Sequence, residues 1–423
     1  MTLSKTDRNI LCLIVILLSI NYMVVTILFH DNIFLKFLRD ILVLILFLKV
    51  LKNKDIFSSK ILMTFFIFIG VLIFAGVRTE DKIVASIVIR RYIFPIICLA
   101  IFTNINFGED RVKILRFVIK FISVLSIFGI IQAIILGDEF LRNLGYPLEY
   151  SYAYGKMMLY TSYYFGGLGI QRVVATFSSS NICGLILGTT LLLGLIYKEY
   201  IFKTKKGGFF LWIIFIGYIL TFSRSNFLAF IFSIFKVKKY ISNKKNIIVK
   251  LLLIGVCVVV FGVIQGTSGI LYKLIGWVES SLNFTESSAA GRSSIWALAF
   301  NEVLHKPFGI GLGHVGVINN EKGLNFWAEN SYLTIALDTG WLGLLLYMIG
   351  LLRIIKYFKI NSLKYLSLKD EQGLKLCKAG ETLTLYMMIV MFFSNHIQDM
   401  EAIVIIYLYI GLGLSYIKYN KLE

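Results

Sequence analysis

The stretch "AENSYLTIALDTGWLGLL", residues 328–345, is an apolar run that carries two carboxylates, Glu329 and Asp338. A helix that crosses a bilayer needs about 20 mostly apolar residues, and the run continues through Leu352. It therefore predicts a membrane helix that begins at the outer face. The two carboxylates are expensive in such a helix and call for partners or a function.

The composition of the whole chain agrees with this interpretation. Of the 423 residues, 58% are hydrophobic and only 16% are charged, and the mean hydropathy is +0.80. Such a chain cannot be wrapped around one soluble core. We predict an all-α, polytopic membrane protein with one membrane domain over residues 1–423. About twelve apolar segments are centred near residues 19, 42, 68, 93, 125, 184, 215, 230, 256, 343, 387 and 408. The segments near 215 and 230 are short and predict a tight or tilted hairpin.

Lysine and arginine orient these segments, because an excess of both in short loops marks the cytoplasmic side. With Lys5 and Arg8 inside, the basic clusters near residues 49–60, 111–116, 198–206, 236–250, 353–378 and 418–421 all fall inside as well. The pattern predicts twelve spans with both termini in the cytoplasm. The net charge of +19 then follows mostly from this bias, and it favours attraction to anionic lipids in the bilayer. No nucleic-acid partner is expected.

Two predicted outer loops, residues 137–172 and 266–330, are much longer than the other connections, and loops of this length are usually functional or disordered. The second loop contains "SSIWALAFNEVL", in which the apolar residues fall on one helical face. This predicts an amphipathic helix on the membrane surface. The glycines of "KPFGIGLGHVGV" follow it, and we interpret them as a turn that returns the chain to the membrane.

Arginines stand at the outer ends of the apolar segments. Arg172, Arg224 and Arg292 lie at segment borders, and Arg90 and Arg91 lie within the fourth span. The planar guanidinium group suits phosphate oxygens bidentately, so these residues are candidates for phosphate binding. For Arg172 the alternative is a side chain that snorkels to the interface from a helix end.

Asp338 has a structural interpretation. It lies about 12 Å inside its span, and Arg90 and Arg91 lie about 10 Å inside theirs, on the same outer half of the bilayer. A buried charge without a partner typically costs about 3–5 kcal/mol. We predict that Asp338 pairs with Arg90 or Arg91 and holds it in place.

Metal and nucleophilic chemistry lack the usual patterns. The four histidines (His30, His305, His314 and His396) show no paired ligand spacing, and no Asp-x-Asp is present. No Ser/His/Asp nucleophile motif is present either. We expect no metal and no cofactor.

Four motifs in order resemble one family. They are "RVVATFSSSNICGLIL", "LTFSRSNFLAF", "GRSSIWALAFNEVLHKPFGIGLG" and "ENSYLTIALDTGWLGLLLYMIGLL". Together they are similar to the O-antigen ligase and polymerase superfamily of bacterial envelope polysaccharide synthesis, well over residues 172–352 and loosely in the topology of the rest. The resemblance implies a metal-independent, inverting glycosyltransferase with a polyprenyl-pyrophosphate-linked glycan as donor. It also implies a multi-pass protein of the bacterial cytoplasmic membrane whose extracytoplasmic arginines bind the pyrophosphate.

The chain departs from the family's ligases at two places. Ligases carry a histidine directly before the asparagine of the fourth motif, where this chain has Glu329. The first motif often has proline before asparagine, where this chain has Ser180 before Asn181. The missing histidine favours a repeat-unit polymerase of an O-antigen, capsular or exopolysaccharide. The alternatives are an O-antigen-type ligase and, in a different class, a flippase or transporter of lipid-linked glycans.

The candidate site follows from these residues. Arg224 and Arg292 are expected to stabilise the departing pyrophosphate, and Glu329 is either a general base for the acceptor hydroxyl or a helix cap. Candidates for substrate binding are Arg172, Arg90, Arg91, Asn330, Tyr152 and Tyr154, where the tyrosines either stack on sugar rings or anchor the interface. The expected partners are lipid-linked oligosaccharide donor and acceptor, the bilayer, a flippase and chain-length regulator proteins.

Overall fold

The computed structural model describes residues 3–30, 32–52, 59–146, 150–153, 156–159, 164–165, 170–202, 207–238, 240, 287–315 and 328–420. The chain divides into two compact units, which we treat separately. Unit 1 comprises Met1–Leu3, Leu44–Gly108 and Phe284–Glu423, and unit 2 comprises Ser4–Val43 and Glu109–Asn283. The prediction of a single membrane domain concerns the whole chain in its bilayer and stays a prediction.

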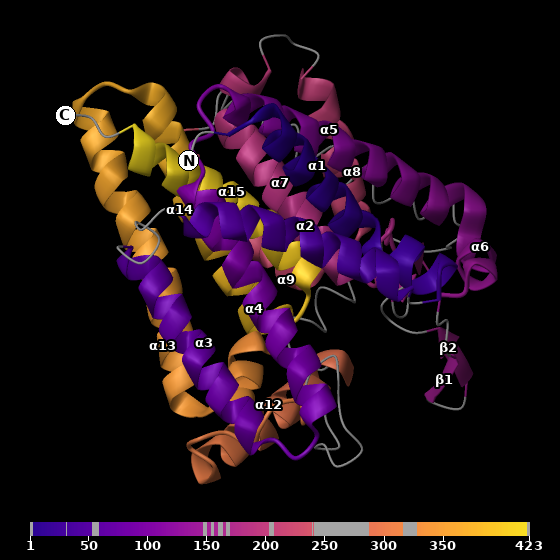
Figure 1. Ribbon diagram of the computed structural model, residues 1–423. Helices are drawn as coiled ribbons and strands as arrows, with labels where there is room; N and C mark the ends of the chain where they lie inside the picture. Colours follow the sequence, from indigo (N-terminus) through magenta and orange to yellow (C-terminus); the bar gives the residue numbers. More distant parts are fainter. Residues whose placement is uncertain are drawn as a thin grey trace. The chain divides into compact units, whose positions relative to one another are not determined.

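Unit 1 is built from helices around α13. Its described helices are α3 (Lys60–Arg78), α4 (Lys82–Asn104), α12 (Ser287–His305), α13 (Ser331–Ser367), α14 (Glu371–Phe393) and α15 (Met400–Tyr419). Helix α13 packs against α3 and α14, and α15 packs against α4 (Figure 1). Helix α15 is apolar around its circumference and buried almost throughout, as expected of a helix inside a bundle.

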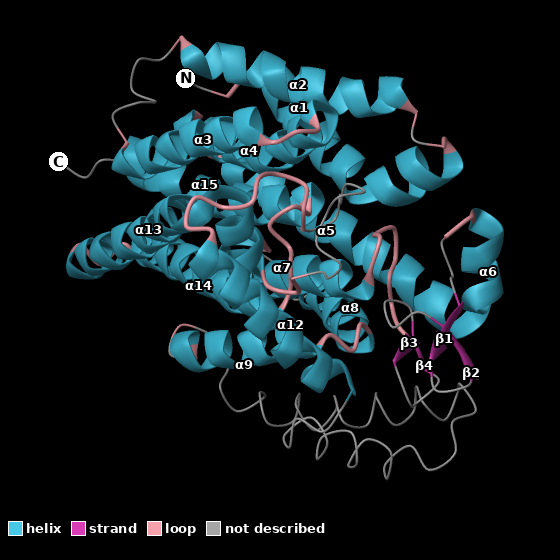
Figure 2. Cartoon of the chain, turned by 90° about the horizontal axis from the view of Figure 1, so that it is seen from below, coloured by secondary structure: helices cyan, strands magenta, loops and turns pink. Residues whose placement is uncertain are grey.

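Unit 2 combines helices with short strands. Its described elements are α1 (Lys5–Ile20), η1 (Asn21–Leu28), α5 (Asp110–Ile131), η3 (Gln132–Leu136), α6 (Gly137–Leu144), β1 (Tyr150–Ala153), β2 (Lys156–Leu159), β3 (Tyr164–Phe165), β4 (Ile170–Gln171), α7 (Ser180–Ile201), α8 (Gly207–Leu220) and α9 (Arg224–Val237). Helices α5, α7 and α8 pack against one another. The strands form two antiparallel hairpins, β1 with β2 and β3 with β4, near α6 (Figure 2). Helix α2 (Ile33–Leu51) crosses the boundary between the units.

The helical, multi-pass class predicted from the sequence is confirmed. Among the described residues, eight helices are long and apolar enough to cross a membrane, and they fall on eight of the twelve predicted segments. Helix α2 is not among these eight, because its 19 residues include four charged ones, Lys36, Arg39, Asp40 and Lys49. Helices α8 and α9 have only 14 residues each. The segment near residue 256 lies outside the described residues, so the number twelve stays a prediction.

The second predicted outer loop contains a helix where the apolar pattern predicts one. Ala299 and Val303 of α12 are buried against Ala336 and Leu337 of α13, while Phe300 remains 49% exposed. One part of the apolar face of α12 therefore packs against α13, and another part is exposed. The location of α12 on the membrane surface stays a prediction.

Candidate functional site

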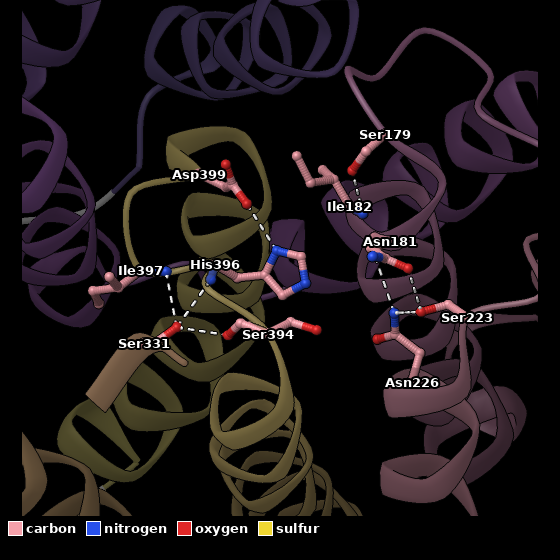
Figure 3. Close-up of polar contacts among 10 residues, drawn as sticks. All are labelled: Ser179, Asn181, Ile182, Ser223, Asn226, Ser331, Ser394, His396, Ile397 and Asp399. Atoms are coloured by element: carbon pink, nitrogen blue, oxygen red, sulfur yellow. Dashed lines mark hydrogen bonds and ion pairs between the residues drawn. The ribbon is translucent and has the colours of Figure 1, made fainter. Parts of the chain in front are cut away.

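Asn181 joins the first two motifs in unit 2. It lies in the first turn of α7, and its side-chain oxygen accepts a hydrogen bond from Ser223 Oγ at 3.0 Å. Asn226 Nδ2 donates to the Asn181 carbonyl oxygen at 3.0 Å and to Ser223 Oγ at 2.7 Å (Figure 3). A Cβ atom added at Gly184 would lie 2.9 Å from Asn226 Nδ2. The small residue therefore lets the turn between α8 and α9 approach α7 closely.

Arg172 also binds this turn. Its Nε donates to the carbonyl oxygen of Thr221 at 2.8 Å, and its Nη2 donates to Asn181 Oδ1 at 2.8 Å. The side chain is buried. A buried guanidinium needs several acceptors because its desolvation is costly. These bonds give Arg172 a positioning role, and its direct contact with a substrate phosphate stays a prediction.

Arg224 is the first residue of α9 and directly follows this turn. It is half-buried. Amide groups at a helix N-terminus favour anions, so the turn presents a guanidinium beside a local positive potential. Arg292 lies in α12 of unit 1, and its side chain is outside the described part of the molecule. The prediction that Arg224 and Arg292 belong to one site therefore stays a prediction.

The fourth motif begins α13 and is tied to the loop before α15. Asn330 is the N-cap of α13, and its side chain accepts from the amides of Tyr332 and Leu333 at 2.9 and 3.1 Å. Its Nδ2 donates to the carbonyl oxygen of Phe392 at 2.8 Å. The residue that caps the helix with its side chain is therefore Asn330, and half-buried Glu329 lies one position before it. The role of Glu329 as a base stays a prediction.

Ser331 fastens the following loop. Its hydroxyl donates to the carbonyl oxygen of Ser394 at 2.9 Å and accepts the amide of His396 at 2.9 Å and that of Ile397 at 3.3 Å. Backbone groups of the loop before α15 are thus bonded to the Ser331 side chain in the first turn of α13 (Figure 3).

His396, which the sequence analysis left without a role, is paired with Asp399. Its Nδ1 lies 2.7 Å from Asp399 Oδ2, and the imidazole is 4% exposed. The signal available in the sequence is His-x-x-Asp in a short connection between two apolar segments. Metal-ligand spacing was the wrong criterion, because a carboxylate can orient a histidine that binds no metal.

Asp338 is fully buried, as its predicted depth implies, but the predicted partner is wrong. Its Oδ2 accepts from the hydroxyl of Tyr92 at 2.7 Å and from Nε2 of Gln398 at 3.3 Å, and no ion pair joins it to Arg90 or Arg91. Successive residues of a helix point about 100° apart, so the face of α4 that meets Asp338 presents Tyr92. Arg90 and Arg91 are half-buried on α4, and their role in substrate binding stays a prediction.

The glycine-rich stretch after α12 forms a turn, as predicted, and it packs against a break in α13. Gly340 has φ 74° and ψ −175°, which no helix tolerates. The amide of Trp341 donates to the Pro307 carbonyl at 3.0 Å, and the amide of Ile310 donates to the Leu337 carbonyl at 2.7 Å. The turn therefore satisfies backbone groups that the break leaves open. Next to it lies a cavity of about 410 Å³, which is lined by Arg78, Lys306, Pro307, Phe308, Gly309, Ile310 and His314.

The structure describes part of the tyrosine-rich 137–172 loop. Tyr152 lies in β1, but its side chain is not described, and Tyr154 lies outside the described residues. Tyr146, from the same loop, is buried with its ring 5.4 Å from that of Tyr22, and burial raises the pKa of its hydroxyl. Tyr146 is thus a core residue, and sugar stacking by Tyr152 and Tyr154 stays a prediction.

Over the described ranges, no group of three or more His, Cys, Asp or Glu residues has a geometry that could hold a metal ion.

Comparison with known proteins gives two matches. Residues 209–348 match the family described as O-antigen ligase. An O-antigen polymerase of Salmonella muenchen is 26% identical over 282 residues, which cover 64% of this chain and 68% of that relative. The residues matched by the family contain the second and third motifs and most of the fourth. Both matches confirm the resemblance that the four motifs predict.

Proposed function

On the basis of this likeness to the O-antigen ligase and polymerase superfamily, we propose that the chain is a repeat-unit polymerase. It transfers a polyprenyl-pyrophosphate-linked glycan onto a second lipid-linked repeat unit, with inversion, at the outer face of the bacterial cytoplasmic membrane. The similarity to a protein named O-antigen polymerase carries the proposal. Glu329, at the position where ligases of the superfamily have histidine, favours polymerisation over ligation.

The leaving group determines what the protein must supply. The anomeric carbon of the donor carries a pyrophosphate, and negative charge builds up on this group as the bond breaks. Preorganised donors directed at such charge are commonly the largest contribution to catalysis. Arg224 suits this role because Arg172 and Asn181 fix the turn from which α9 begins. Arg292 is the proposed second donor, and no metal is needed for this step.

The acceptor is a sugar hydroxyl of the second repeat unit. Removal of its proton during attack by a positioned base is worth about 10²–10⁴ in rate. Glu329 is the base proposed from the sequence, and it lies beside the Asn330 cap at the start of α13. In the twelve-span topology predicted from the sequence, the start of α13 faces the same side of the membrane as the turn that carries Arg224.

Reconstitution of the purified full-length protein with lipid-linked repeat units tests the proposal. We expect a ladder of lipid-linked polymers that grows without an ion or voltage gradient. Transfer only to an acceptor that is not a repeat unit would indicate a ligase. Movement of the glycan across the bilayer without a new glycosidic bond would indicate a flippase. In cells, a deletion strain should accumulate single repeat units, whereas loss of a ligase would leave full-length polymer on its lipid.

A further inference from the structure

The connection between α14 and α15, residues 394–399, is a built polar site. Its backbone is fixed by Ser331, which accepts the amides of His396 and Ile397. Gln398 donates to Asp338, and Asp399 binds His396. The bonds to Ser331 and Asp338 come from α13 and the one to Asp399 lies within the loop, so the loop has a defined geometry independent of any ligand.

Two consecutive residues of this loop keep unused hydrogen-bonding atoms. Oδ1 and Nδ2 of Asn395 and Nε2 of His396 are buried and have no hydrogen-bond partner in the described part of the chain. Asn395 is 8% exposed and His396 is 4% exposed. Buried polar atoms are rarely left in this state, because they lose their bonds to water. Together they offer one donor and two acceptors, which matches a group with hydroxyls that both donate and accept.

Asp399 determines which atom of the imidazole is available. An ionised carboxylate only accepts hydrogen bonds, so Nδ1 of His396 carries the proton that points at Asp399, and Nε2 of the neutral ring carries a lone pair. Asp399 is the N-cap of α15, yet its side chain makes no capping bond. The carboxylate therefore serves the histidine instead of the helix end.

We propose that His396, oriented by Asp399, is the general base that activates the acceptor hydroxyl, and that Asn395 binds a neighbouring hydroxyl of the same sugar. The proposal rests on the proposed polymerase function and names its acceptor subsite. Nε2 takes the proton as the hydroxyl oxygen forms its bond to the anomeric carbon of the donor. The electron pair of the broken carbon–oxygen bond leaves with the polyprenyl pyrophosphate. Asp399 stabilises the imidazolium until its proton passes to solvent.

His396 and Glu329 are both connected to the start of α13 in unit 1. Ser331, which accepts the amide of His396, lies two residues after Glu329. The difference between them is orientation: Asp399 at 2.7 Å fixes the lone pair of His396 in one direction. We therefore assign proton removal to His396 and leave Glu329 the task of positioning the acceptor.

The test is turnover of the reconstituted full-length protein with His396→Gln, Asp399→Asn and Glu329→Gln. His396→Gln should lower kcat by about 10²–10⁴-fold with little change in KM for the donor. Asp399→Asn should also lower kcat, because an amide can donate to Nδ1 and favour the wrong tautomer. Asn395→Ala should instead raise KM for the acceptor. The loop should stay folded in all of them, because its bonds to Ser331 come from backbone groups, which these substitutions keep.

Rescue separates chemistry from structure. Added imidazole should restore part of the turnover of His396→Ala and leave the parent unchanged. The matched control is His305→Ala on α12, where the ring of the exposed His305 bonds the Asn301 carbonyl of its own helix. Its turnover should equal that of the parent.

Parental turnover of His396→Gln, or loss of turnover in Glu329→Gln alone, would overturn the assignment while the polymerase function stands. A loss in His396→Ala that imidazole does not restore would reduce His396 to a structural residue. Failure of the parent itself to lengthen lipid-linked repeat units would instead overturn the proposed function, and the base with it.

Discussion

At the scale of single residues, burial and position distinguish two arginines of the candidate site. Arg172 and Arg224 come from adjacent motifs and have the same chemistry, but Arg172 is buried with bonds to Thr221 and Asn181. Arg224 begins the helix that this arrangement positions. We therefore expect Arg224 to act on the substrate and Arg172 to act through Arg224.

Replacing Arg224 or Arg292 with lysine tests this role, because lysine keeps the positive charge and loses the bidentate fork. If these arginines stabilise the leaving pyrophosphate, polymer formed per folded protein should fall by about 10²–10³-fold. The matched control is Arg353→Lys: this arginine of α13 bonds the Lys60 carbonyl and the Thr64 hydroxyl, and the change should leave polymer formation near the parental level. Near-parental polymer from both Arg224→Lys and Arg292→Lys would mean that they only anchor the interface, as lysine also does.

The sequence predicts single residues in part. The burial of Asp338 follows from its depth in an apolar run, but its partner depends on how α4 is rotated, and the difference between Arg91 and Tyr92 is one residue. His396 was missed for a related reason. Its importance comes from burial and from contacts with Asp399 and Ser331, and only the first of these partners is close in sequence.

At the scale of elements, the break in α13 shows how a membrane helix tolerates a glycine with a positive φ angle. Unsatisfied backbone groups are costly in a bilayer, and non-helical backbone is tolerated there only when protein or water covers it. The 307–310 turn provides this cover, and it approaches so closely that a Cβ atom at Gly309 would lie 2.7 Å from the Gly340 amide nitrogen. Glycine is thus required on both sides of the contact.

We predict that Gly340→Ala destabilises the protein strongly. Backbone strain alone should cost about 1–3 kcal/mol, and the new Cβ would also lie 2.3 Å from the Pro307 carbonyl oxygen. The measurement is thermal unfolding in detergent. The control is Gly70→Ala in α3, where an added Cβ meets nothing within 4 Å, and alanine should stabilise the helix by about 0.5–1 kcal/mol. Equal melting temperatures for the two variants would contradict the packing described for α13.

Elements were predicted best where apolar runs are long. Eight of the twelve predicted segments coincide with long apolar helices because burial in lipid requires about 20 residues of one kind. The two hairpins of the 137–172 loop gave no such signal, since strands of two to four residues show too little alternation to be recognised. The helices α8 and α9 were correctly predicted as short, and rings of Tyr218 and Phe227 pack between them at 5.1 Å.

At the scale of the whole molecule, sidedness determines whether the motifs can share one reaction. Four predicted spans separate the two long loops, and an even number places both loops on the same side. Helices α8 and α9 are each about 21 Å long at 1.5 Å per residue, which is less than the hydrocarbon thickness of about 30 Å. As a hairpin they contribute either two crossings or none. In both cases the number of crossings between the two long loops stays even.

Cysteine labelling in intact cells or spheroplasts tests this sidedness. The five native cysteines are first replaced by alanine, and single cysteines are then introduced as Ser151→Cys and Ser287→Cys. Because both loops are predicted to face outward, an impermeant thiol reagent should label both. Ser367→Cys, at the end of α13 that is predicted to face the cytoplasm, is the control and should react only after permeabilisation. Protection of both loop cysteines would reverse the topology, and the motif arginines would then face the cytoplasm. Labelling of only one would mean an odd number of crossings between the loops, which would separate Arg172 and Arg224 from Arg292 and Glu329 by the thickness of the bilayer and exclude a common active site.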